Sequence, residues 1–179
     1  MKRRAINETG FRSIRPARYI LLFAFLMLIG FGILVAPFAQ PPLDAFTQTI
    51  VKCSAGLIRF LGGSVKAQGV IMTEPVHGFA VELQNGCNGV EVMIVLWAAI
   101  LAFPAPWMSR IKGCLLGAVA IQVANFARFI SLFYIGQYSL PLFEFTHVFL
   151  WQSLIMLDAM VVFWLWVRGG FQNAVARHA

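Results

Sequence analysis

The stretch YILLFAFLMLIGFGILVAPFA, residues 19–39, contains twenty-one residues and no charged side chain. An α-helix needs about twenty apolar residues to cross a hydrocarbon core about 30 Å thick. The stretch is longer than the apolar part of a signal peptide, and no small-residue cleavage site clearly follows it. It therefore predicts a membrane-spanning helix that the protein retains.

Three further apolar runs predict three more spans, one of them interrupted by Arg128 and one by Asp158. We expect these spans at about 88–108, 113–135 and 147–167. The fold class is then an all-α integral membrane protein with four transmembrane helices in one membrane domain, residues 19–167.

The composition favours a membrane protein over a soluble one. Of the 179 residues, 60% are hydrophobic and 12% are charged, about half the charged fraction of a soluble domain. The net charge of +7 could indicate a nucleic-acid partner, but six of the fourteen basic residues precede the first apolar run. A basic flank beside a span is typical of an orientation signal. We therefore expect membrane lipid as a partner, and no nucleic acid.

The basic residues predict the orientation of the spans. The tail of residues 1–18, the loop with Arg110 and Lys112, and the tail of residues 168–179 carry six, two and two of them. These three segments lie on one side of a four-span topology. The positive-inside rule then places both termini in the cytoplasm and the segment 40–87 outside.

The outer segment is predicted to contain a helix and a hairpin. Apolar residues at Phe46, Ile50, Leu57 and Leu61 predict an amphipathic helix over 44–61 that lies on the outer surface. The runs 64–73 and 76–83 have strand character, and Pro75 between them predicts a turn. This small β-hairpin leads directly into Asn85-Gly86-Cys87-Asn88-Gly89.

Three polar side chains reach the same level of the predicted membrane. With a rise of 1.5 Å per residue, Arg128 lies about 22 Å from the start of its span at Gly113, roughly 8 Å below the outer boundary. Cys87 and His147 begin their own spans at that boundary. A thiol at a helix N-terminus, an imidazole that can activate it and a guanidinium predict a cysteine acyl-transfer site.

Each of the three also has a structural interpretation. Cys87 could be a small packing residue, Arg128 a paired structural arginine and His147 an interfacial histidine. The glycines beside Cys87 and the convergence of three segments favour the catalytic interpretation. Cys53 and Cys114 lack such surroundings, and the three cysteines form neither a CxxC motif nor an even set for disulfides. No metal site is predicted.

Four further residues are expected to support the site. Glu91 lies one turn beyond Cys87 on the same face, about 6 Å below the outer boundary. Intramembrane charges tend to pair, so we expect a Glu91–Arg128 ion pair or a network that includes Asn125. Asn88 and Gly89 would contribute free backbone amides. Outside this set of four, Glu144 is a candidate to orient His147.

The motifs Gly86-Cys87-Asn88-Gly89, Asn125-Phe126-Ala127-Arg128 and His147, in this order and topology, resemble the exosortase/archaeosortase family over roughly residues 76–167. The short chain resembles the exosortase H subtype. Family members often have Ser after the Cys, where this chain has Asn88.

The resemblance implies a cysteine transpeptidase of the bacterial inner membrane with its active site facing outward. Its partner would be an exported protein that ends in a short motif, an apolar helix and a basic tail. Cys87 would be the nucleophile, His147 the proton-transfer residue and Arg128 the third catalytic residue, with an acceptor still to be identified. No metal or organic cofactor is implied.

Two other function classes stay open on the residues alone. A membrane thiol-redox protein would use Cys53 with Cys87. A small transporter or assembly subunit would line a polar path with Glu91, Arg128 and Asp158.

Overall fold

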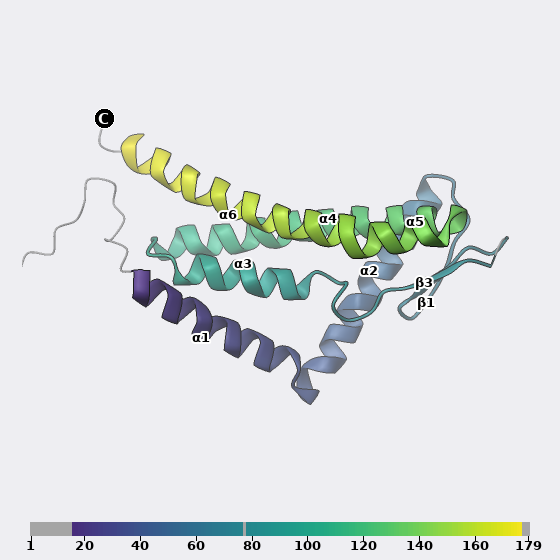
Figure 1. Ribbon diagram of the computed structural model, residues 1–179, viewed down its shortest axis with the longest axis horizontal. Helices are drawn as coiled ribbons and strands as arrows, with labels where there is room; N and C mark the ends of the chain where they lie inside the picture. Colours follow the sequence, from purple (N-terminus) through teal and green to yellow (C-terminus); the bar gives the residue numbers. More distant parts are fainter. Residues whose placement is uncertain (1–15, 77, 177–179) are drawn as a thin grey trace, which may run out of the picture.

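The computed structural model describes residues 16–76 and 78–176 and is mostly helical (Figure 1). The basic residues of the N-terminal tail up to Arg15, and also His77 and Arg177, lie outside the described residues. The helices are α1 (Pro16–Leu34), the 3-10 turn η1 (Pro37–Ala39), α2 (Gln40–Phe60), α3 (Val90–Ala102), α4 (Trp107–Tyr138), α5 (Leu140–Phe145), the π-helical turn η2 (Thr146–Leu150) and α6 (Trp151–Ala176).

Three helices in the described part of the chain are long and apolar enough to cross a membrane. They are Pro16–Leu34, Trp107–Tyr138 and the continuous helix Leu140–Gly169, which joins α5, η2 and most of α6. The multi-pass membrane architecture is therefore confirmed. The fourth expected span, 88–108, is not confirmed, because α3 has only thirteen residues and a length of about 20 Å. Phe103 leaves the helical conformation, and Pro104 follows it.

Two helices begin earlier than the sequence predicted. α4 starts at Trp107 instead of Gly113 and continues to Tyr138, which gives it 32 residues and a length of about 48 Å. The last helix starts at Leu140 instead of His147, because the Ser139 hydroxyl accepts a hydrogen bond from the Leu142 N–H and Pro141 occupies the first turn. His147 therefore lies inside a helix.

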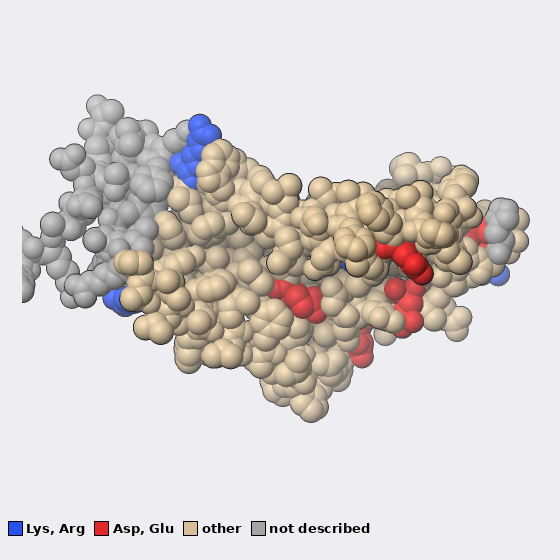
Figure 2. Space-filling view, in the orientation of Figure 1, with Lys and Arg blue, Asp and Glu red and all other residues tan. Residues whose placement is uncertain are grey.

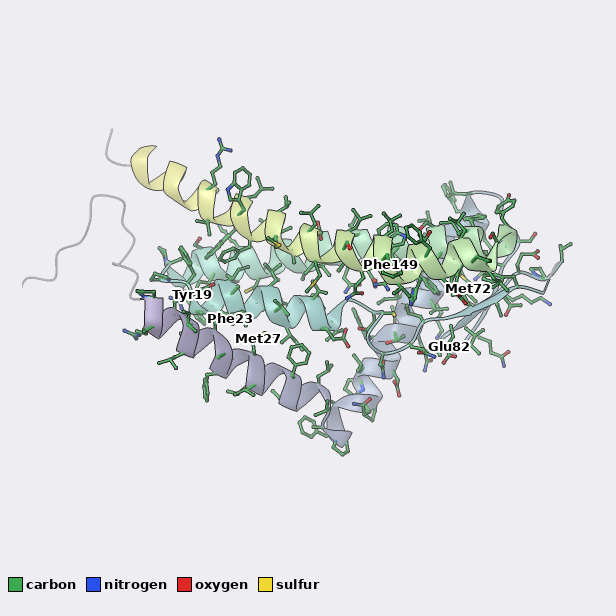
Figure 3. The ribbon with its side chains drawn as sticks, in the orientation of Figure 1. Tyr19, Phe23, Met27, Met72, Glu82 and Phe149 are labelled. Atoms are coloured by element: carbon green, nitrogen blue, oxygen red, sulfur yellow. The ribbon has the colours of Figure 1, made fainter. Side chains whose placement is uncertain are left out.

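The long helices form a bundle whose charged ends differ. α1 and α4 point away from the end where the described chain begins, and α3 and α6 return to it (Figure 1). On the face drawn in Figure 2, basic side chains lie at this end and also at the opposite tip, and acidic side chains lie only over the other half. α1 packs on α3, and the Tyr19 ring stacks on Phe23 and meets the edge of Phe103, with centroids 6.3 and 6.2 Å apart (Figure 3).

α2 is amphipathic, as predicted, but a different face is buried. Phe46, Leu57 and Leu61 were expected on the apolar face and are exposed, whereas Ile50 is buried. The buried stripe follows a spacing of three or four residues and includes two hydroxyl side chains. It consists of Leu43, Thr47, Ile50, Val51, Ser54, Ala55 and Ile58. This stripe packs against α4 and the sheet.

The expected hairpin is a three-stranded antiparallel sheet with strands β1 (Lys66–Gln68), β2 (Ile71–Thr73) and β3 (Ala80–Glu82) in sequence order. The first predicted strand, 64–73, is itself a hairpin, because Gly69 adopts a left-handed backbone conformation at φ 59° and reverses the chain. Met72 and Val81 pair across β2 and β3 and are both buried. They join a core with α2 and α4 that also supports the site.

Candidate active site

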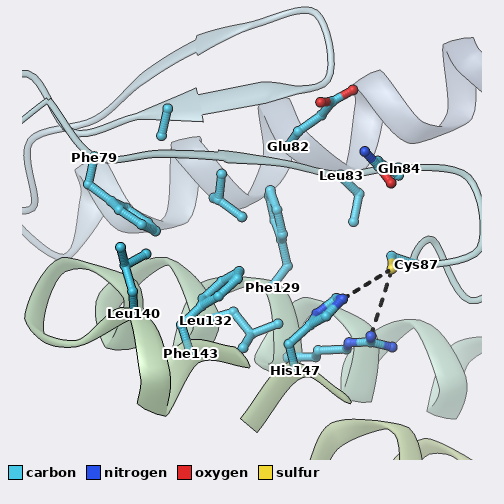
Figure 4. Close-up of a pocket in the computed structure, with 13 residues that line it drawn as sticks. Phe79, Glu82, Leu83, Gln84, Cys87, Phe129, Leu132, Leu140, Phe143 and His147 are labelled. Atoms are coloured by element: carbon cyan, nitrogen blue, oxygen red, sulfur yellow. Dashed lines mark hydrogen bonds between the residues drawn. The ribbon is translucent and has the colours of Figure 1, made fainter. Parts of the chain in front are cut away.

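A cavity of about 340 Å³ lies between β3 and the helices α4 and α5 (Figure 4). It contains the three side chains that the sequence singled out, surrounded mainly by apolar groups. Its lining residues are Phe79, Ala80, Val81, Glu82, Leu83, Gln84, Cys87, Arg128, Phe129, Leu132, Leu140, Phe143 and His147. The cavity therefore offers a thiol, an imidazole and a guanidinium within an otherwise largely apolar enclosure.

Cys87 sits on the loop that joins β3 to α3. Its sulfur lies 4.0 Å from His147 Nε2 and accepts a hydrogen bond from Arg128 Nη2 at 3.8 Å (Figure 4). The Cys87 N–H donates to the Gln84 carbonyl at 3.0 Å, which closes the turn. Gly89 precedes α3 and has a left-handed φ of 82°, a conformation that is unfavourable for residues with a side chain.

The next residue, Asn88, is fully buried and fixes this loop to its surroundings. Its Nδ2 donates to the Thr47 hydroxyl of α2 at 3.0 Å, and its Oδ1 accepts from the Val90 N–H at 3.1 Å. Its carbonyl accepts from Gln122 Nε2 of α4 at 3.1 Å. The loop with the thiol is thus attached to three helices. Among the described residues, the N–H groups of Asn88 and Gly89 have no acceptor, but both residues are buried and neither lines the cavity.

Arg128 reaches the thiol from the middle of α4 and is 5% exposed. Among the described residues, no carboxylate pairs with the Arg128 guanidinium, which donates to the Cys87 sulfur. A buried guanidinium beside a sulfur atom attracts negative charge at that position. The site is therefore suited to an anion that forms beside the sulfur.

His147 faces the thiol because the helix contains the π-helical turn η2. In a regular helix with about 100° per residue, His147 would point about 80° away from Ile155. A π turn holds one additional residue, which reduces this difference to about 20°. Ile155 is buried in the bundle, so the turn brings His147 onto the inward face. The ring also stacks on Phe143, with centroids 5.7 Å apart and planes 1° apart.

A comparison with known protein families identifies the family of the chain. The family model described as Transmembrane exosortase (Exosortase_EpsH) matches residues 8–165, most of the chain. The chain belongs to the transmembrane exosortase family. Searches of curated proteins and of solved structures found no match. All three residues that carried the sequence resemblance lie within the matched segment of this exosortase.

The ion pair expected between Glu91 and Arg128 is wrong. Glu91 Oε2 is buried without a hydrogen-bond partner, and neither polar atom of the Asn125 side chain has one, so the expected network is missing as well. Glu91 lies in the first turn of α3, whereas Arg128 turns toward the sulfur. The expectation treated Cys87 as part of that helix, but the left-handed Gly89 separates them and changes the direction of the chain.

Other expected roles in the exosortase are not supported by contacts. Glu144 is exposed, and His147 Nδ1 is buried without a partner, so this carboxylate does not orient the ring. Cys53 is exposed, and both Cys53 and Cys87 are free cysteines, so the two do not form a disulfide. Asp158 does not line the cavity.

The sequence did not reveal the apolar wall of this exosortase site. Phe79 and Phe143 meet edge to face with centroids 6.1 Å apart, and Phe79 also contacts Phe133 at 6.3 Å. Phe79 lies so close to Gly136 of α4 that a Cβ atom there would overlap its ring. One signal was available, because Ser139 and Pro141 together predict a helix start that places Phe143 one turn before His147.

Proposed function

We propose that this exosortase is a membrane cysteine transpeptidase that cleaves a C-terminal sorting signal of exported proteins. One observation carries the proposal: the Cys87 sulfur lies 4.0 Å from His147 Nε2 and 3.8 Å from Arg128 Nη2 within one cavity. A nucleophile, a base and a cation in mutual reach are the groups that acyl transfer through a thioester requires.

In the first step, His147 Nε2 takes the proton of the Cys87 thiol, and the sulfur attacks the carbonyl carbon of the scissile peptide bond. The carbonyl oxygen becomes an oxyanion. Arg128 Nη2, which lies at the sulfur and lines the cavity, stabilises it. The Cys87 N–H is engaged by Gln84 and does not take part.

In the second step, the oxyanion collapses and the carbon–nitrogen bond breaks. The protonated His147 gives its proton to the leaving amine, which departs with the C-terminal segment. The acyl group stays on the sulfur as a thioester. An amine, a hydroxyl group or water then attacks the thioester carbonyl and loses a proton to His147. The carbon–sulfur bond breaks, and His147 returns this proton to the departing Cys87 sulfur.

The substrate carries a short motif, an apolar helix and a basic tail, and its cleavage site reaches the outer face of the inner membrane. The positive end of the bundle, where both ends of the described chain lie, supports a cytoplasmic location for the two termini. We propose that α3 together with residues 103–106 completes a fourth crossing, because the chain must return to that end before α4 begins at Trp107.

The test uses a co-expressed exported reporter protein whose C-terminus has an apolar helix and a basic tail. We expect the protein to release the tail and to form a hydroxylamine-sensitive adduct with the reporter at Cys87, visible by mass spectrometry. Cys87→Ala should abolish both. Cys53→Ser and Cys114→Ser should leave both unchanged. Reporter cleavage that survives Cys87→Ala, or that is lost in Cys53→Ser, would overturn the proposal.

A further inference from the structure

We infer that the free edge of β3 binds the substrate backbone as an additional strand, which leads the scissile bond to Cys87. The inference rests on the proposed function and specifies how the same site holds its substrate. β3 is the last strand of the sheet in the order β1-β2-β3, so one of its edges has no partner strand. An exposed edge is a ready template for an extended peptide.

The register determines which groups β3 offers. The Glu74 N–H donates to the Phe79 carbonyl at 2.8 Å, and the Leu83 N–H donates to the Val70 carbonyl at 2.9 Å. Phe79 and Leu83 therefore direct their backbone groups toward β2. Because the direction alternates along an antiparallel ladder, Ala80 and Glu82 direct both their N–H and C=O groups toward the free edge.

This edge belongs to the active-site cavity. Ala80 and Glu82 line the cavity on one side, and Leu140, Phe143 and His147 line it on the other. Figure 4 shows Phe79 and Leu83 pointing toward these helices, whereas Glu82 points away from them. A strand added here would place every second side chain in the apolar cavity.

The edge also points toward the thiol. The chain runs from Glu82 through the turn at Gln84 to Cys87, so β3 and the nucleophile are parts of one short segment. A peptide paired with Ala80 and Glu82 lies beside this segment and continues toward the sulfur. The arrangement fits an extended segment next to the cleavage site, with an apolar side chain among Leu132, Phe129 and Phe143.

The first test varies the substrate. Mass spectrometry of the processed reporter gives the cleavage position, and synthetic peptides covering that position and the apolar helix are then N-methylated at one residue each. With the purified protein in lipid nanodiscs, we expect kcat/KM to fall about tenfold at every second residue, because each loss removes one edge hydrogen bond. Equal effects at successive residues, or no effect, would overturn the pairing.

The second test varies the enzyme. Ala80→Pro removes an N–H from the free edge of β3, a position where an edge strand tolerates proline. Ala67→Pro is the matched control: Met72 directs its backbone groups toward β3, so Ala67 opposite it faces the outer edge of β1. We expect Ala80→Pro to raise KM about tenfold and Ala67→Pro to leave it unchanged, at equal unfolding temperatures. Equal KM values for the two variants would contradict the inference.

The two proposals fail in different ways. If the unmodified peptide is not cleaved, or is cleaved by Cys87→Ala, the proposed function is wrong and the pairing with it. If Cys87 cleaves the unmodified peptide but the N-methyl series has no period of two, only the pairing is wrong.

Discussion

The side-chain nitrogen of Asn88 lies 3.0 Å from the Thr47 hydroxyl oxygen, so the loop with the nucleophile is held by α2, which contributes no group to the cavity. Asn88 and Thr47 are both almost completely buried. This bond explains how Asn can follow the Cys in this chain. Its amide reaches α2 with one end and caps the Val90 N–H with the other.

Removing the Thr47 hydroxyl should weaken the site from a distance. Thr47→Val keeps the shape of the side chain but leaves the Asn88 amide without its acceptor, at a cost of about 1–3 kcal/mol. We expect a lower unfolding temperature and a lower kcat for reporter cleavage. Thr49→Val is the control. Both threonine hydroxyls donate to the backbone carbonyl four residues earlier in α2, but Thr49 is exposed and does not contact Asn88. Equal behaviour of both variants would show that the Asn88 contact is unimportant.

Arg128→Lys should abolish most of the activity although it retains the charge. The guanidinium reaches the sulfur at 3.8 Å, and a lysine cannot reproduce its planar array of donors. Loss of one oxyanion donor reduces kcat about 100-fold, which single-turnover cleavage would measure. Arg59→Lys on α2, which is exposed, should have no effect. If Arg128→Lys kept a kcat close to the original, the positive charge would be sufficient and the guanidinium geometry would not be needed.

Gly136→Ala should change the cavity without affecting the catalytic groups. The new Cβ atom would overlap the Phe79 ring, which lines the cavity and must then shift. We expect a higher KM for the peptide with a much smaller change in kcat. Gly56→Ala on α2 has no neighbour within 4 Å and serves as the control. A change in kcat alone would contradict this explanation.

Glu91→Gln should be tolerated. An ion pair with Arg128 would have made Glu91 essential for folding or activity, but its buried oxygen has no partner. A neutral amide removes the cost of an unpaired charge. We expect kcat/KM within about twofold of the original and an equal or higher unfolding temperature in lipid nanodiscs. A clear loss of activity would instead indicate that Glu91 acts on the substrate or on a proton.

The sequence predicted the convergence at the site better than its details. The order of apolar runs was enough to bring Cys87, Arg128 and His147 together, because alternating helices return polar residues to the same end of a bundle. The predicted depths of these residues in the membrane depended on regular helices that end at charged residues. This prediction could not include the left-handed Gly89 that turns Glu91 away, or the helix start at Ser139.

Burial on α2 was the weakest part of the sequence prediction. Phe46 and Leu57 are apolar but exposed, whereas Thr47 and Ser54 are polar and buried. In a membrane protein, an apolar side chain can face lipid as well as the core, so hydrophobicity alone does not identify the packed face. The Thr47–Asn88 contact depends on the tertiary structure and has no local sequence signal.

The π-helical turn Thr146–Leu150 gives the last helix two registers, one on each side of it. Such a turn is what remains when one residue is inserted into an α-helix that must preserve its contacts on both sides. A single added codon can therefore rotate the histidine end of this helix without altering any side chain in the packing of α6. Descendants of one bundle could acquire or lose this chemistry through a change in length instead of a substitution.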